Sequence, residues 1–451
     1  MAKYKAYPEY KDSGVDSFGS IPKKWSALRL KYIFEIKKRI AGTLGFDILS
    51  VTQKGIKIKD IDSGEGQLSM DYSKYQRVLP GEFAMNHMDL LTGYVDISKY
   101  DGVTSPDYRV FSVRDNNDFY SRYFLYLLQD GYKQRRFFHL GQGSAHLGRW
   151  RLPTEAFNEI IYPLPSLEEQ VKIADFLDHE TAKIDKLIEK QQQLIELLKE
   201  KHQAVISHAV TKGLNPDVLM KDSGVEWLGE VPEHWLCSKI KHIALLTPKK
   251  SAANFKPNDE CTFIPMEKLK RNSLVTDESK FIREVINGYT YFEENDLLLA
   301  KVTPCFENKN IAVACGLVNR VGFGSTEIYV LRPTEKVQVN YLLYRLQEDN
   351  FIRAATGAMT GAGGLKRVPS DFLLNYPIAI PPKSEMDAIV DYLGEQEARY
   401  DLIEKNATNA VQLLQERRTA LISAAVTGKI DVRDWIAPDI SDIKATEEAT
   451  A

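Results

Sequence analysis

Few cysteines and no long apolar run occur in this chain of 451 residues. Its four cysteines include no C-x-x-C pair, and a zinc or disulfide framework would need such paired spacing. No stretch of about 18 apolar residues is present, and the opening MAKYKAYPEYKDSG lacks the apolar core of a secretion signal. These absences predict isolated, reduced thiols, no metal site, and a cytoplasmic chain that does not enter a membrane.

Signatures of catalysis are also missing. The glycine-rich stretch 357–366 has Leu365 where a P-loop would place a glycine before its lysine. The chain contains no Asn-Pro-Pro-Tyr motif of an amino-methyltransferase, and no Pro-Asp pair is followed by a nuclease-like Glu-x-Lys. Its eight histidines do not cluster as metal ligands. We therefore expect no catalytic activity and no bound cofactor in this chain.

What the sequence does contain is a duplication. KDSGVDSFGSIPKKWSALRLKYI, residues 11–33, returns as KDSGVEWLGEVPEHWLCSKIKHI, residues 221–243. Further on, PSLEEQVKIADFL is echoed by PKSEMDAIVDYL, and ISHAVT by ISAAVT. The chain is thus two copies of one order, a globular segment followed by a long helical one. In each copy we expect the tryptophan, Trp25 or Trp235, to be a buried anchor of the N-terminal block.

The two globular segments show mixed secondary-structure signals. Residues 10–164 and 219–381 alternate short β-like runs, such as YRVFSV and IYVLRP, with turn residues. Aromatic and apolar residues at helical spacing predict a helix over 120–138 in the first segment and over 341–355 in the second. Each segment is therefore expected to be an α/β globule.

The helical segments carry coiled-coil spacing. Residues 167–212 predict two helices with a break near His179, and the second copy spans 384–426. Gly213 and Gly428 are the expected helix stops. Positions alternate in steps of four and three along a first seam and along a weaker second one: Ile184, Ile188, Gln191, Ile195, Leu198, His202, Val205 and Ala209; then Ile403, Ala407, Ala410, Leu414 and Leu421. We expect these helices to pair, antiparallel, within one chain.

These signals predict an α+β fold with an internal pseudo-two-fold repeat. Two α/β domains are separated by two long helices that form an intrachain antiparallel coiled coil. The predicted boundaries are 1–164 for the first domain with its arm, 165–218 for the first spacer, 219–381 for the second domain, 382–436 for the second spacer, and 437–451 for a disordered acidic tail.

The net charge of −3 conceals an uneven distribution. Residues 166–212, 383–428 and 437–451 carry −2, −3 and −3, which leaves +5 for the rest of the chain. Most of that rest belongs to the two globular segments, and a local basic face is the electrostatic footprint of a DNA-binding protein. The distribution therefore permits a DNA-binding face without requiring one.

A glycine-rich segment follows the aromatic helix in both copies. Glycine lets the backbone approach a phosphate closely, and Arg, Lys, Gln, Ser and Thr side chains bind phosphates or base edges. The alternative is a flexible surface loop, but recurrence in both copies favours a function. The candidate DNA-binding residues are Arg135, Arg136, Gln142, Ser144, His146, Arg149, Arg151, Thr360, Lys366 and Arg367.

The ordered set of duplicated motifs resembles the specificity (S) subunit of a Type I restriction-modification system. The resemblance covers nearly the whole chain. It rests on the arms at 11–25 and 221–235, on the blocks that open each helix, and on the ISxAVT blocks near the helix ends. In addition, GVTSPDYRVF at 102–111 is similar to a stretch common in the target-recognition domains of that family.

The resemblance implies two target-recognition domains that each read one half of a bipartite site in double-stranded DNA. The helical spacers would also dock two methyltransferase (M) subunits. S-adenosylmethionine would be bound by those subunits, and ATP and Mg²⁺ by separate restriction/translocase (R) subunits. This chain would direct adenine methylation and restriction without catalysing either. Two other interpretations remain, a stand-alone sequence-specific DNA-binding regulator and a coiled-coil scaffold without affinity for DNA.

Overall fold

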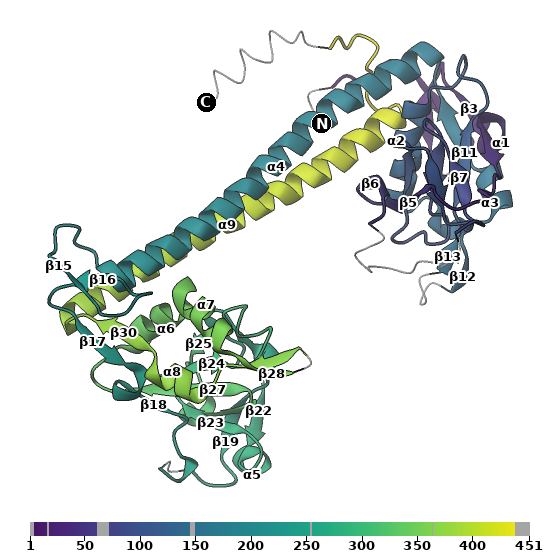
Figure 1. Cartoon of the computed structure of the whole chain (residues 1–451). Coiled ribbons are helices and arrows are strands. Elements are labelled where there is room, and N and C mark those ends of the chain that lie inside the picture. The colour runs from purple at the N-terminus through teal and green to yellow at the C-terminus, as the bar shows by residue number, and fades with distance from the viewer. Residues whose placement is uncertain are drawn as a thin grey trace. The chain divides into compact units, whose positions relative to one another are not determined.

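The computed structural model describes most of the chain (Figure 1). The described residues are 4–15, 18–60, 72–144, 149–252, 255–362 and 364–437. The chain divides into two compact units, Met1–Gln191 with Asn409–Ala451, and Gln192–Thr408. The part of the predicted acidic tail that follows Ala437 lies outside the described residues. The candidate DNA-binding residue His146 also lies outside them.

Two four-stranded sheets form the globular part of the first unit, in the orders β6-β5-β10-β7 and β4-β11-β8-β9. Phe34 of the second sheet contacts Phe124 of helix α2, with ring centroids 5.6 Å apart, so this helix packs on that sheet. The elements are β4 (Phe34–Lys37), β5 (Asp47–Thr52), β6 (Gly55–Ile58), β7 (Gln76–Val78), β8 (Phe83–Met85), β9 (Val95–Ile97), β10 (Gly102–Thr104), β11 (Arg109–Val113), α1 (Leu30–Ile33), α2 (Ser121–Lys133) and α3 (Thr154–Glu159).

The second unit repeats this topology strand for strand. Its sheets have the orders β22-β19-β26-β23 and β18-β27-β24-β25, which match the first unit when β18 is equated with β4. A small hairpin of β20 (Leu269–Lys270) and β21 (Ser273–Leu274) is added. The other elements are β18 (Ala244–Leu246), β19 (Glu260–Ile264), β22 (Ser279–Phe281), β23 (Thr290–Glu293), β24 (Leu297–Ala300), β25 (Ile311–Val313), β26 (Val321–Gly324), β27 (Ile328–Pro333), α5 (Ile282–Val285) and α8 (Ser370–Asn375). The predicted duplication thus extends to the whole sheet arrangement.

The duplicated N-terminal block forms the same anchor in both units. Trp25 and Trp235 are buried, and the backbone N–H of each donates to the carbonyl of the proline three residues earlier, at 2.9 Å. The anchor role predicted for both tryptophans is therefore confirmed. The strands around them are β1 (Tyr10–Asp12), β2 (Ser20–Pro22), β3 (Ser26–Arg29) and β14 (Ile161–Leu164), and their counterparts β15 (Met220–Asp222), β16 (Glu230–Pro232), β17 (Leu236–Lys239) and β30 (Pro377–Ile380).

Two helix predictions in the globular segments need correction. The helix predicted over 120–138 ends at Lys133, and a short 3-10 turn, η1 (Phe138–Leu140), follows. The helix predicted over 341–355 is two helices, α6 (Val339–Gln347) and α7 (Asp349–Ala358). They part at Glu348, whose buried carboxylate accepts hydrogen bonds from Arg345 and from the Ser207 hydroxyl. This buried ion pair fixes extended backbone at Glu348.

The break predicted near His179 is wrong. Helix α4 runs without interruption over Leu167–Lys212, and its counterpart α9 over Lys383–Val426. Residues 167–212 contain no proline and no glycine, the two residue types that most readily end a helix. Both helices are followed by glycine with positive φ, 78° at Gly213 and 74° at Gly428, which confirms the predicted stops. No helix in the described ranges has the length and hydropathy needed to span a membrane.

The two long helices pair in antiparallel fashion, as predicted (Figure 1). In the second unit Lys199 lies 3.9 Å from Glu404, and the rings of His202 and Tyr400 stack with centroids 4.9 Å apart. In the first unit the Arg418 guanidinium bonds the Asp185 carboxylate at 2.8 Å. Every residue of the predicted seams is buried or half-buried. The α+β fold class with an intrachain coiled coil is therefore confirmed.

Candidate nucleic-acid interface

Both glycine-rich segments fold as β-hairpins rather than as loops. Strand β12 (Gln142–Ser144) pairs with β13 (Arg149–Arg151), and β28 (Thr360–Ala362) pairs with β29 (Leu365–Arg367). Seven of the ten candidate residues therefore lie on two matching hairpins. Only the backbone of Ser144 and Arg149 is described, whereas Gln142, Arg151, Thr360 and Lys366 are exposed at the surface.

Glycine has a specific geometric role in each hairpin. Gly143 and Gly361, the central residues of β12 and β28, have φ of 119° and 142°, which L side chains rarely adopt. A Cβ atom on Gly361 would lie 2.4 Å from the Leu365 carbonyl oxygen. In the first hairpin the Trp150 indole covers Gly141 and donates from Nε1 to the Phe138 carbonyl at 2.7 Å. These glycines allow the two strands to approach closely.

Each hairpin is rooted by main-chain hydrogen bonds at the same place in its unit, the turn that follows β8 or β24. In the first unit the N–H of Leu152 donates to the His87 carbonyl at 2.8 Å. In the second, the N–H of Val368 donates to the Lys301 carbonyl at 2.9 Å. Because these bonds use only backbone atoms, they fix the hairpin while leaving its side chains free to differ.

A cleft of about 480 Å³ lies beside the first hairpin, and Arg151 lines it together with His87, Arg109 and Lys38. Arg109 is buried, donating from Nη2 to the Leu152 carbonyl at 3.0 Å and to Thr154 Oγ1 at 3.3 Å. Burial lowers the pKa of Arg109 to about 10, so it stays charged at neutral pH. Burial, helped by the Arg109 charge, lowers the pKa of His87 to about 4, so the imidazole is neutral there.

In the second unit the candidate arginine already has a partner. Arg367 donates two hydrogen bonds of 2.8 Å to the carboxylate of Glu327, which lowers the pKa of that glutamate. Lys366 forms no ion pair with any residue that the structure describes, and Thr360 beside it is exposed. Of this set, Lys366 is therefore the available cation.

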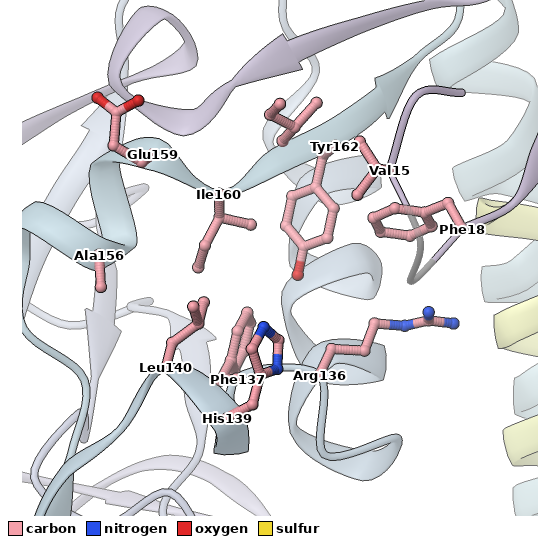
Figure 2. Close-up of a pocket in the computed structure, with 11 residues that line it drawn as sticks. Val15, Phe18, Arg136, Phe137, His139, Leu140, Ala156, Glu159, Ile160 and Tyr162 are labelled. Atoms are coloured by element: carbon pink, nitrogen blue, oxygen red, sulfur yellow. The ribbon is translucent and has the colours of Figure 1, made fainter. Parts of the chain in front are cut away.

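Arg135 and Arg136 lie apart from the hairpin. Arg136 donates from Nε to the buried carboxylate of Asp130 at 3.2 Å, and its guanidinium covers the Phe18 ring at 4.8 Å. It lines a largely apolar pocket of about 250 Å³ between the arm and the end of α2, to which no other candidate residue contributes (Figure 2). Arg136 thus connects α2 to the arm, while Arg135 is exposed.

Sequence reasoning named neither Arg109 nor His87 as a site residue. The available signal was the run YRVFSV, in which an arginine occupies a strand position whose counterpart in IYVLRP is tyrosine. Among the described residues, no group of three His, Cys, Asp or Glu side chains is placed to hold a metal ion.

Comparison with known proteins finds a family model and several relatives that match part of this chain. Residues 22–197 match the family model of the Type I restriction modification DNA specificity domain. The Type I restriction enzyme EcoAI specificity subunit of Escherichia coli is 34% identical over 190 residues, which are 42% of this chain and 32% of that protein. The match thus spans about a third of that relative's length.

Two solved structures share the fold of the chain. A structure from work on complex assembly and conformational transition of the type I R-M system has a TM-score of 0.67 at 13% identity, covering 91% of this chain and 99% of that one. The HsdS subunit from Thermoanaerobacter tengcongensis has a TM-score of 0.51 at 15% identity, covering 91% and 98%.

The hairpin geometry predicts opposite effects for two glycine substitutions in the second unit. Gly361→Ala is expected to destabilise the unit by about 1–3 kcal/mol, because alanine is strained at this φ and its Cβ meets the Leu365 carbonyl. Gly357→Ala, in α7 with open space around it, should stabilise by about 0.5–1 kcal/mol through helix propensity. Urea unfolding measures both, and equal midpoints for the two variants would contradict the hairpin geometry.

Proposed function

We propose that this chain is the sequence-recognition subunit of a Type I restriction-modification complex, because residues 22–197 match the family model of the Type I restriction modification DNA specificity domain, in agreement with the resemblance seen in the sequence. It binds a bipartite site in double-stranded DNA and directs adenine methylation and restriction by its partner subunits. The chain itself catalyses neither reaction. S-adenosylmethionine is bound by the methyltransferase subunits, and ATP and Mg²⁺ by the restriction subunits. Its target places it in the cytoplasm.

The observation that carries the proposal is the repetition of one strand order in two units whose hairpins differ in side chains. Two DNA-binding domains with the same fold suit a DNA target that consists of two separated half-sites. Different side chains at matching positions suit halves of different sequence, because base edges are distinguished by the donors and acceptors presented to them.

In this proposal the hairpins carry the DNA contacts. Gln142, Ser144, His146, Arg149 and Arg151 serve the first half-site, and Thr360, Lys366 and Arg367 serve the second. Glutamine and arginine can each form paired hydrogen bonds to a purine edge, whereas a lysine bonds a phosphate or a guanine. The exposure of Gln142, Arg151, Thr360 and Lys366 leaves their polar atoms available to DNA.

The proposal also includes two methyltransferase subunits, for which the helices offer matching apolar positions. Leu197 of α4 is 62% exposed, and Leu413, its equivalent on α9, is 64% exposed. Large apolar side chains at the same exposed position in both copies favour two equivalent docking surfaces for a protein partner. A stand-alone regulator would have no use for them, so the complex is preferred over that alternative.

Recognition through the hairpins predicts that single substitutions relax one half-site only. In cells, methylome sequencing should reveal a gene-dependent bipartite adenine-methylated motif. Gln142→Ala should broaden the bases accepted in one half and Lys366→Ala those in the other, each at about 1–3 kcal/mol for a lost base contact. A lysine or arginine that contacts a phosphate instead would lower methylation of all sites without broadening them.

Gln53→Ala serves as the control for these variants, because its exposed amide lies outside the hairpins. Its motif should be that of the wild type. If methylomes with and without the gene are the same in a strain that expresses the partner subunits, the proposed function is wrong. If the motif is present but neither hairpin variant alters it or its extent, the hairpins do not contact DNA.

The matched leucines predict the composition of the complex. Co-expressed with its methyltransferase, the chain should form a complex of two methyltransferases to one, measured by light scattering. Leu413→Asp should reduce the ratio to one methyltransferase per chain, since a carboxylate on one apolar surface opposes docking there. The double variant Leu197→Asp, Leu413→Asp should bind no methyltransferase. Leu245→Asp, an exposed leucine away from the helices, is the control. A saturated one-to-one complex of the wild type would contradict two docking surfaces.

A further inference from the structure

A buried arginine without a counter-ion lies in the cleft beside the first hairpin. Arg109 is only 3% exposed, and its Nη1 atom has no hydrogen-bond partner among the described residues. No carboxylate in the described part of the chain forms an ion pair with it. Buried charges are costly unless they are paired, so an unpaired guanidinium in a cleft wall indicates a missing anionic partner.

The structural work of Arg109 does not require a charge. In the second unit the equivalent residue of β27 is Tyr329, whose hydroxyl donates to the Val368 carbonyl at 2.8 Å. Arg109 donates to the carbonyl of Leu152, the residue that follows the first hairpin as Val368 follows the second. A neutral hydroxyl therefore secures this segment in one unit. In the other, the Arg109 guanidinium also lies over the Phe157 ring, with Cζ 4.5 Å from the ring centroid, and its Nη1 atom still has no hydrogen-bond partner among the described residues.

The rest of the cleft is positively charged. Lys38 and Arg151 also line it, and neither forms an ion pair with any described residue. The opposing group is the exposed carboxylate of Asp107, which forms no ion pair with these cations. Three cations face one carboxylate, while His87 adds no charge because burial and the Arg109 charge lower its pKa to about 4.

The second unit neutralises the corresponding groups internally. Glu327, the counterpart of Asp107, binds Arg367, the counterpart of Arg151, through two hydrogen bonds of 2.8 Å. Lys301, the counterpart of His87, lies over the Tyr329 ring with Nζ 5.0 Å from its centroid. At this place the two units therefore differ: the first has an open cationic cleft, and the second has an internal ion pair.

We propose that the cleft formed by Arg109, Lys38 and Arg151 binds a backbone phosphate of the DNA at the first half-site, and that the second unit lacks this site. Nη1 of Arg109 donates a charge-assisted hydrogen bond to a phosphate oxygen, while Lys38 and Arg151 approach from the rim. A phosphate contact positions the duplex and carries no sequence information. The inference rests on the proposed function, because the anion is supplied by the recognised DNA.

The test replaces Arg109 with the residue that the second unit uses. Arg109→Tyr keeps a hydroxyl for the Leu152 carbonyl and removes the charge. The full-length chain, purified in complex with its methyltransferase subunits, is titrated against a duplex carrying its motif and against a scrambled duplex, by fluorescence anisotropy at several KCl concentrations. We expect both affinities to fall by about tenfold and the slope of log affinity against log salt to decrease by about 1.

Two controls accompany this variant. Arg114→Gln removes an exposed arginine just beyond the other end of β11 and should leave affinity and slope unchanged. Wild-type chain titrated against duplexes with one neutral methylphosphonate each needs no variant, so it decides the matter even if Arg109→Tyr unfolds. A methylphosphonate at one position beside the first half-site should lower the affinity and the salt slope as much as Arg109→Tyr does.

Other results would overturn the inference in distinguishable ways. Equal affinity and slope for Arg109→Tyr and the wild type would reject the phosphate site while leaving DNA recognition intact. Loss on the specific duplex alone would make Arg109 a base-reading residue. If inorganic phosphate raises the melting temperature of the wild type but not of Arg109→Tyr, and DNA binding is equal, the cleft takes a free anion. If the complex of the wild-type chain with its methyltransferase subunits binds neither duplex at any salt concentration, the proposed function itself fails.

Discussion

The main-chain hydrogen bonds that root each hairpin are the constraint on which the rest of the site depends. The N–H of Leu152 donates to His87 in one unit and that of Val368 to Lys301 in the other. Because the bonds involve only backbone atoms, residue types in the hairpins and in the adjoining cleft can change without loss of the frame. One topology therefore presents Arg109 and a free Arg151 in the first unit, and Tyr329 with a paired Arg367 in the second.

Much of this architecture could be predicted from the sequence because it is written twice. The two KDSGV blocks located Trp25 and Trp235, and large aromatic residues at matching positions of a duplicated block are expected to be buried. Spacing in steps of four and three located the seam, since such spacing keeps one face of a helix against its neighbour. Gly213 and Gly428, just past the repeated ISxAVT blocks, marked the helix ends for the same reason.

The remainder depends on contacts between residues far apart in the sequence. The break at Glu348 arises from a buried ion pair with Arg345 and a hydrogen bond from Ser207, which no local periodicity reports. The glycine-rich segments predict loops by composition, whereas Gly143 and Gly361 are present for close strand pairing. Arg109 could have been noticed by aligning YRVFSV with IYVLRP, but its lack of a counter-ion is visible only in the fold.

The central claim is that one frame is used twice with different contacts, and exchanging a frame tests it most directly. In the chimera, residues 34–160 replace residues 244–376, so that both arms and both long helices remain. Methylome sequencing of cells that carry the chimera and its partner subunits should then give a motif whose two halves are both the first half-site. A motif that retains the second half-site would contradict the account, because the residues assigned to read it would be absent.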